Sequence, residues 1–95
     1  MALSWSTPKD PDEVLDYQID WSTLLGTDTI ITSTWVFADA QDNALVMDSN
    51  THTTTTATVW LSAGTAGTTY QLTNRITTLG GRTRDQTMKL KVKDK

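Results

Sequence analysis

The residue types that most often carry out catalysis are scarce in this chain and are not grouped. The one histidine, His52, lies between two threonines beside a turn-forming segment. A nucleophilic triad would need its imidazole to contact both a carboxylate and a serine, and nothing in the sequence places those groups around it. The absence of cysteine excludes thiolate nucleophiles, thiolate metal sites and disulfides. We therefore interpret His52 as an exposed loop residue and predict no catalytic residues, no cofactor and no enzymatic activity.

Two further segments resemble binding motifs but are incomplete. Four carboxylates near the N-terminus offer the oxygen ligands that calcium prefers, yet they lack the Asp-x-Asp-x-Asp-Gly spacing and the distal glutamate of a calcium loop. The segment Gly80-Gly81-Arg82 could form a phosphate nest, but no helix and no lysine-serine pair follow it. We interpret the first as a solvated acidic arm and the second as a hairpin turn, and we predict no metal site. The four carboxylates are those of Asp10, Asp12, Glu13 and Asp16.

The tryptophans give the stronger signal, because four in 95 residues is several times the usual frequency. Trp21 and Trp35 fit inward positions of strands, and Trp5 lies in the N-terminal segment. Trp60 alternates out of phase with its two apolar neighbours, so it faces outward if they face the core. Exposed tryptophans are enriched at protein interfaces. Packing of Trp60 under a loop or against the N-terminal segment, or a stacking platform for sugars, are the alternatives.

A lysine stripe follows the last apolar alternation of the chain. Lys89, Lys91, Lys93 and Lys95 recur at every second residue, so they share one face of a strand. Lysines on an edge strand prevent unwanted pairing between sheets, and the same charges could complement an acidic partner. We favour edge protection and keep the second interpretation open.

Length and charge restrict the class of protein. A chain of 95 residues corresponds to one domain with a modest core. A net charge of −3 with a pI near 4.7 disfavours nucleic acid as a partner. No apolar run approaches the ~20 residues that span a bilayer, and the first residues lack the features of a signal peptide. We expect a protein made in a cytoplasm that has no membrane partner.

The elements that would position these residues are strands. Threonine makes up about a fifth of the chain, and its β-branched side chain favours extended backbone. Apolar residues alternate with period two, whereas no helical period persists over three turns. Turns are predicted at residues 26–28, 48–50 and 80–81, and loops at 38–43 and 62–68. The predicted strands are 14–21, 29–37, 44–47, 53–61, 69–78 and 82–93.

This pattern predicts an all-β fold, an immunoglobulin-like antiparallel β-sandwich of six or seven strands. Tyr70 stands at the start of a strand after a glycine-containing loop, where such folds place a tyrosine whose hydroxyl contacts upstream backbone. Pro8 and Pro11 lack amide donors, so residues 1–13 should form an extended arm, with the sandwich at 14–95. The expected core residues are Tyr17, Ile19, Trp35, Tyr70, Leu72, Ile76, Leu90 and Val92.

Four segments of the chain are distinctive as a set, namely Lys9 to Trp21, Val59 to Gly67, Thr73 to Thr78 and Gly80 to Asp85. Together they resemble a family of short virion proteins encoded in the structural gene modules of tailed bacteriophages and prophages. Members are described as fiber-tail adaptor or tail accessory proteins. The resemblance spans nearly the whole chain.

The resemblance implies a virion part assembled in the host cytoplasm, present in several copies around a ring and without catalytic residues. Its partners would be other virion proteins of the tail, neck or fibers. A head decoration protein that bridges capsomers, and a carbohydrate-binding module, are the alternatives. We hypothesise that the arm, by adding as a strand to a neighbour's sheet, and Trp60 make intersubunit contacts. The candidate interface residues are Trp5, Pro8, Pro11, Trp60, Arg75, Arg82 and Arg84.

Overall fold

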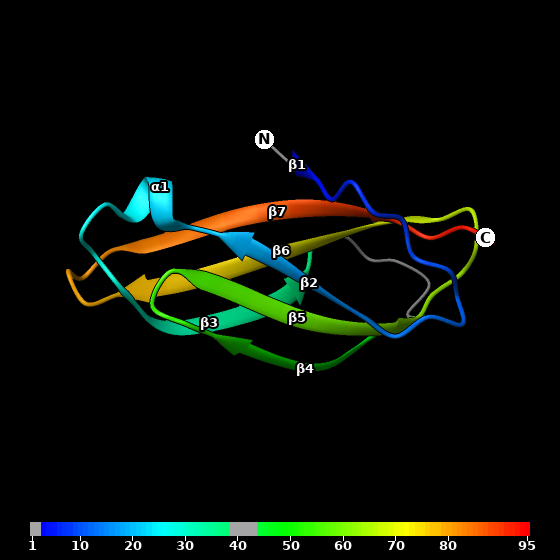
Figure 1. The fold of residues 1–95 in the computed structure, drawn as a ribbon, viewed down its shortest axis with the longest axis horizontal. Coiled ribbons are helices and arrows are strands. Elements are labelled where there is room, and N and C mark those ends of the chain that lie inside the picture. Colours follow the sequence, from blue (N-terminus) through cyan, green and yellow to red (C-terminus); the bar gives the residue numbers. More distant parts are fainter. Residues whose placement is uncertain (1–2, 39–43) are drawn as a thin grey trace.

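The computed structural model describes residues 3–38 and 44–95, which form an elongated body of 41 × 21 × 20 Å (Figure 1). Nearly all of its regular structure is β. The described elements are β1 (Leu3–Ser4), β2 (Leu15–Asp20), α1 (Ser22–Leu25), β3 (Ile30–Phe37), β4 (Leu45–His52), β5 (Thr56–Ala63), β6 (Thr69–Thr78) and β7 (Thr83–Lys91).

The strands form two packed sheets with the order β1-β7-β6-β3 and β2-β5-β4. All neighbouring strands are antiparallel except β1 and β7, which run parallel. This order reproduces the B-E-D and C-F-G sheets of immunoglobulin domains, with β2, β5 and β4 as the first set and β3, β6 and β7 as the second. The predicted immunoglobulin-like sandwich is therefore confirmed.

The core lies between the sheets and is built largely from alternate residues of β2, β5, β6 and β7. Ala57, Val59 and Leu61 of β5 are fully buried and face a matching row on β6. Ile19 is only partly buried and packs at the margin of the core. The other seven residues that the alternation placed inside are buried, namely Tyr17, Trp35, Tyr70, Leu72, Ile76, Leu90 and Val92.

The loop before β6 is closed by the tyrosine that the sequence singled out. The hydroxyl of Tyr70 accepts a hydrogen bond of 2.9 Å from the backbone N–H of Thr65. Within this loop Gly64 has a φ of +101°, and a Cβ there would lie 3.1 Å from a methyl group of Val92. The predicted tyrosine corner is therefore present, and glycine allows its loop to pack against the core.

Threonines cover the outward face of the four-stranded sheet, which explains much of the unusual composition. Thr73 on β6 and Thr87 on β7 are cross-strand partners whose hydroxyls are hydrogen-bonded at 2.8 Å. The hydroxyls of Thr32 on β3 and Thr77 on β6 form a second such pair. Cross-strand threonine pairs stabilise a sheet while leaving its face polar.

One local prediction was wrong, and one element was not predicted. Residues 48–50 do not form a turn, because β4 continues through them and a bulge between Met47 and Ser49 absorbs one residue. The chain reverses at Thr53, whose hydroxyl accepts hydrogen bonds from the backbone N–H groups of Thr55 and Thr56. The helical turn α1 after Trp21 was not predicted, and four residues are too few for an apolar period to show. The predicted loop 38–43 lies outside the described residues except for Ala38.

Candidate protein-binding surfaces

An apolar patch on the outward face of the three-stranded sheet is centred on Trp60. This residue lies in the middle of β5, the central strand, between Asp16 of β2 and Ser49 of β4. Trp60 is 40% exposed, and the exposed Val46 lies diagonally across the β4–β5 ladder. Exposed Val14 immediately precedes β2. We call Val14, Val46 and Trp60 the Trp60 patch.

Small polar side chains surround Trp60 on this face of the sheet. The neighbouring outward positions on β5 are Thr58 and Ser62, and Asp16 stands beside the indole. A large aromatic side chain surrounded by small polar groups is typical of the anchor residues of protein interfaces. The outward orientation that alternation predicted for Trp60 is confirmed by its burial pattern.

The N-terminal segment packs against its own sandwich. The ring of Trp5 lies 4.9 Å from that of Tyr17 and 5.9 Å from that of Trp35, measured between centroids. Its indole N–H donates to the backbone oxygen of Gln18, and its backbone N–H donates to that of Lys89, each at 3.0 Å. Trp5 therefore bridges β2 and β7, one from each sheet, and closes the side of the sandwich between them.

Lys9 continues this closure near the C-terminus, which lies at one end of the body (Figure 1). It pairs with Val92 in a parallel bridge and is completely buried. Its ammonium group donates to the backbone oxygens of Asp10 and Ala63. Burial lowers the pKa of Lys9, against the opposing effect of Glu13 and other nearby carboxylates. The segment thus contributes a buried, hydrogen-bonded charge to its own domain.

The two prolines have different surroundings, and both are half-buried. Pro8 lines a hollow of about 360 Å³ beside Trp5, Lys89 and Lys91. Pro11 occupies a turn in which the backbone N–H of Glu13 donates to the oxygen of Asp10.

The carboxylates around that turn bind their own chain. Glu13 accepts from the backbone N–H of Asp10 and from the Lys95 ammonium, and Asp10 accepts from the backbone of Asp12 and Lys95. These hydrogen bonds lower the pKa of both Asp10 and Glu13. Within residues 3–38 and 44–95, no three His, Asp or Glu side chains gather closely enough to hold a metal ion.

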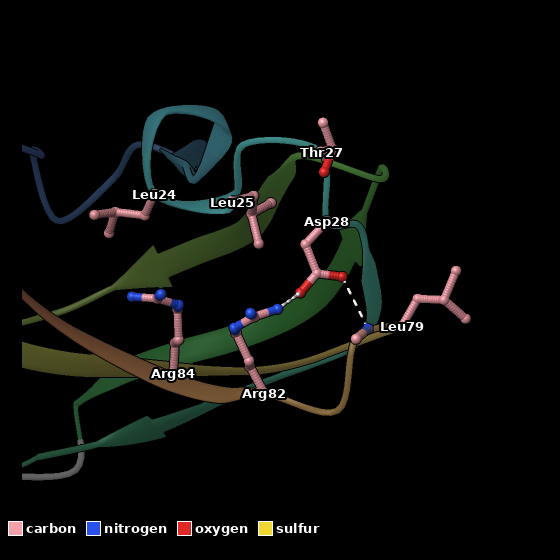
Figure 2. Close-up of a pocket in the computed structure, with 8 residues that line it drawn as sticks. Leu24, Leu25, Thr27, Asp28, Leu79, Arg82 and Arg84 are labelled. Atoms are coloured by element: carbon pink, nitrogen blue, oxygen red, sulfur yellow. Dashed lines mark hydrogen bonds and ion pairs between the residues drawn. The ribbon is translucent and has the colours of Figure 1, made fainter.

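At the opposite end of the body, Asp28 fastens two loops together (Figure 2). Its carboxylate accepts hydrogen bonds from the backbone N–H groups of Thr29 and Gly80, both at 2.9 Å, and forms an ion pair of 3.1 Å with Arg82. A hydrogen bond from Thr78 and these contacts lower the pKa of Asp28 from 3.8 to about 2. The segment between α1 and β3 is thereby tied to the β6–β7 turn.

Beside Asp28 lies a hollow of about 450 Å³ that we call the loop-end hollow. It is lined by α1, by the segment after it and by the β6–β7 turn. Figure 2 shows Arg84 rising from β7 toward α1, next to Arg82. The lining residues are Leu24, Leu25, Thr27, Asp28, Leu79, Gly80, Arg82 and Arg84.

The seven candidate residues do not form one surface. Arg82 and Arg84 meet at the loop-end hollow, as their spacing of two residues along a strand allows. Arg75 lies on the outward face of the four-stranded sheet, where it makes a bidentate ion pair with Asp85 at 2.8 and 2.9 Å. Trp60 is on the outward face of the other sheet, and Trp5, Pro8 and Pro11 belong to the N-terminal segment.

The lysine stripe does not protect a free edge. Lys89 and Lys91 are exposed on β7, but β7 is flanked by β1 and by the Lys9 bridge, so the prediction of an edge strand was wrong. Lys95 contacts Glu13 at 2.8 Å. The described part of the chain includes no helix long and apolar enough to span a bilayer.

Asp28, Leu24 and Leu25 are the site residues that sequence reasoning missed. The apolar pair before Gly26 was the available signal for a buried cap on the sandwich end. The partner of Asp28 at Gly80 is 52 residues away, and a polar contact of that range leaves no local pattern.

Residues 9–91 match the family model described as podophage GP4 fiber-tail adaptor protein gp77. No protein with a curated description matches the chain.

Proposed function

The chain belongs to the podophage GP4 fiber-tail adaptor family, and we propose that it is a non-catalytic virion part that attaches fibers or other components to the tail. Attachment proceeds through protein-protein contacts, with several copies of the domain arranged around the tail. The family match over residues 9–91, which is nearly the whole chain, is the observation that carries this proposal.

The Trp60 patch supplies the attachment surface. The core is already filled by the inward side chains on either side of Trp60, which are completely buried. The exposed part of the indole is therefore free to contact a partner, and a rigid aromatic ring offers apolar area at small entropic cost. Its position on a central strand holds it on a rigid support, which lowers the cost of binding.

Contact through a preformed surface fits the structure better than donation of the N-terminal segment to a neighbour. Donation would break the hydrogen bonds of Trp5 to both sheets and extract the completely buried Lys9. These contacts stabilise the donor domain, so binding to a partner would have to compensate for the whole of the stability that the donor domain loses. We therefore assign residues 3–9 to the sandwich and attachment to its outer faces.

A complementation experiment tests the role. A phage that carries this gene is propagated with the gene inactivated and supplied in trans as wild type, Trp60→Thr or Thr58→Ala. We expect particles without the protein to lack a defined tail component, wild type and Thr58→Ala to restore it, and Trp60→Thr to be incorporated poorly. Complete particles in the absence of the protein would refute the adaptor role. Normal incorporation of Trp60→Thr would refute only the choice of surface.

A further inference from the structure

Arg84 lines the loop-end hollow from β7. Its Nε atom is buried and makes no hydrogen bond, and no ion pair joins Arg84 to a carboxylate of residues 3–38 or 44–95. Buried polar groups in folded proteins nearly always have a hydrogen-bond partner, and charged groups most of all. A group that fits the hollow and accepts hydrogen bonds would therefore satisfy Arg84.

The charge of the loop-end hollow defines that group as an anion. Arg82 is neutralised by Asp28, which is committed to four hydrogen bonds and stays ionised because its pKa is about 2. Arg84 then leaves one positive charge in the hollow of a chain whose net charge is −3. An arginine fork matches a carboxylate with two parallel hydrogen bonds.

The apolar residues that line the hollow indicate which kind of molecule carries the anion. Leu24 and Leu25 lie on α1 above the two arginines (Figure 2), and Leu24 is largely exposed. Apolar surface at this position favours an aspartate or glutamate that stands beside an apolar residue. A phosphate would gain nothing from the leucines, so a nucleic-acid backbone fits less well.

We propose that the loop-end hollow is a docking site for an acidic segment of a partner protein, in which one carboxylate pairs with Arg84 and a neighbouring apolar side chain covers Leu24. This proposal rests on the proposed adaptor function and names a second contact, at the end of the body, distinct from the Trp60 patch. An adaptor joins two bodies, and two separate surfaces allow both to be bound at once.

A minimal ligand tests the chemistry of the site directly. The intact protein is titrated with N-acetyl-leucine, which carries a carboxylate next to an isobutyl group, while the Nε–H resonance of Arg84 and the methyl resonances of Leu24 are followed by NMR. N-acetyl-leucinamide is the neutral control and inorganic phosphate the second anion. We expect saturable shifts with N-acetyl-leucine alone and at least about tenfold weaker binding to Arg84→Gln, since a charge-assisted pair is lost. Leu24→Ser, an exposed position, should weaken binding several-fold without affecting the fold.

The control variant is Arg75→Gln, which removes the same charge from the outward face and should bind like wild type. Equal binding of N-acetyl-leucine and phosphate would overturn the assignment to a protein carboxylate, and absence of saturable shifts would overturn the site. Self-association of the wild type that Arg84→Gln abolishes would overturn a separate partner in favour of a second copy of this chain.

Particle assembly separates this proposal from the proposed function. In the complementation experiment, Arg84→Gln and Leu24→Ser should reduce the incorporation of one tail component while Arg75→Gln restores it. If both variants assemble normally while loss of the whole protein does not, the docking site is refuted and the adaptor role stands. If particles are complete without the protein, the adaptor role fails, and the NMR titration still decides the chemistry of the hollow.

Discussion

The indole N–H of Trp21 donates a hydrogen bond of 2.9 Å to the side-chain oxygen of Asn74 in the centre of the sandwich. Trp21 follows the last residue of β2, whereas Asn74 lies on β6, so this bond joins the two sheets. The amide nitrogen of Asn74 donates to the hydroxyl of Ser33 and the backbone oxygen of Thr34, both at 2.9 Å. Both the oxygen and the nitrogen of the fully buried Asn74 amide are therefore hydrogen-bonded.

Asn74→Ala is expected to lower the free energy of unfolding by about 2–4 kcal/mol, because it leaves a cavity and buried donors and acceptors without partners. Urea denaturation followed by circular dichroism measures the loss. Gln71→Ala, on the outward face of the same strand, is the control and should change stability by less than about 0.5 kcal/mol. Equal effects of the two substitutions would show that the buried network does not stabilise the fold.

Tyr70→Phe should cost about 1–2 kcal/mol of stability, since it removes the acceptor for the Thr65 N–H while keeping the ring in the core. Amide exchange at Thr65 should accelerate in the same variant, which distinguishes loss of this bond from a general loss of stability. Unchanged protection of Thr65 would mean that its N–H has another acceptor.

Acidification should weaken the attachment between the two loops that Asp28 joins. The pKa of Asp28 is about 2 in the folded chain and 3.8 without these contacts, so its stabilisation is present above pH 4 and is lost as the pH falls toward 2. The stability advantage of wild type over Asp28→Asn should therefore shrink between pH 5 and pH 2. Asp16→Asn removes the same charge elsewhere and should not reproduce this trend, which thermal denaturation across the range would reveal.

Truncation of Trp5 and truncation of Trp60 should lower the stability of the fold by different amounts. Trp5→Ala is expected to lower stability by about 2–4 kcal/mol, because its ring packs on Tyr17 and Trp35. Trp60→Thr should cost clearly less than this, because its side chain faces outward and the residue is 40% exposed. Equal losses in the free energy of unfolding, measured by urea denaturation, would mean that Trp60 stabilises the fold as much as Trp5 does, which would argue against a role mainly in partner contact.

Alternation of side chains made most of the fold predictable. The inward rows on β5, β6 and β7, the outward orientation of Trp60 and the position of Tyr70 all follow from period two and local turn chemistry. The bulge after Met47 was not predictable in this way, because an extra residue in one strand shifts the phase without a change in composition.

The candidate site was only partly predictable, since its geometry depends on contacts between distant segments. The sequence indicated Arg82 and Arg84 as candidate interface residues, but not that Asp28 would pair with the first while the second makes no ion pair within the described residues. Likewise, the prolines indicated an extended N-terminal segment. They did not indicate where Trp5 packs, because that position forms only when β2 and β7 come together.

The parallel pairing of the first strand with the last has a mechanical consequence. Because β1 and β7 run in the same direction, tension that pulls the two ends of the chain apart acts along the strands and slides one past the other. The hydrogen bonds of Trp5 and Lys9 to Lys89, Lys91 and Lys93 then share the load at the same moment instead of opening one after another. A body joined in this way resists drag along its long axis better than its modest size suggests.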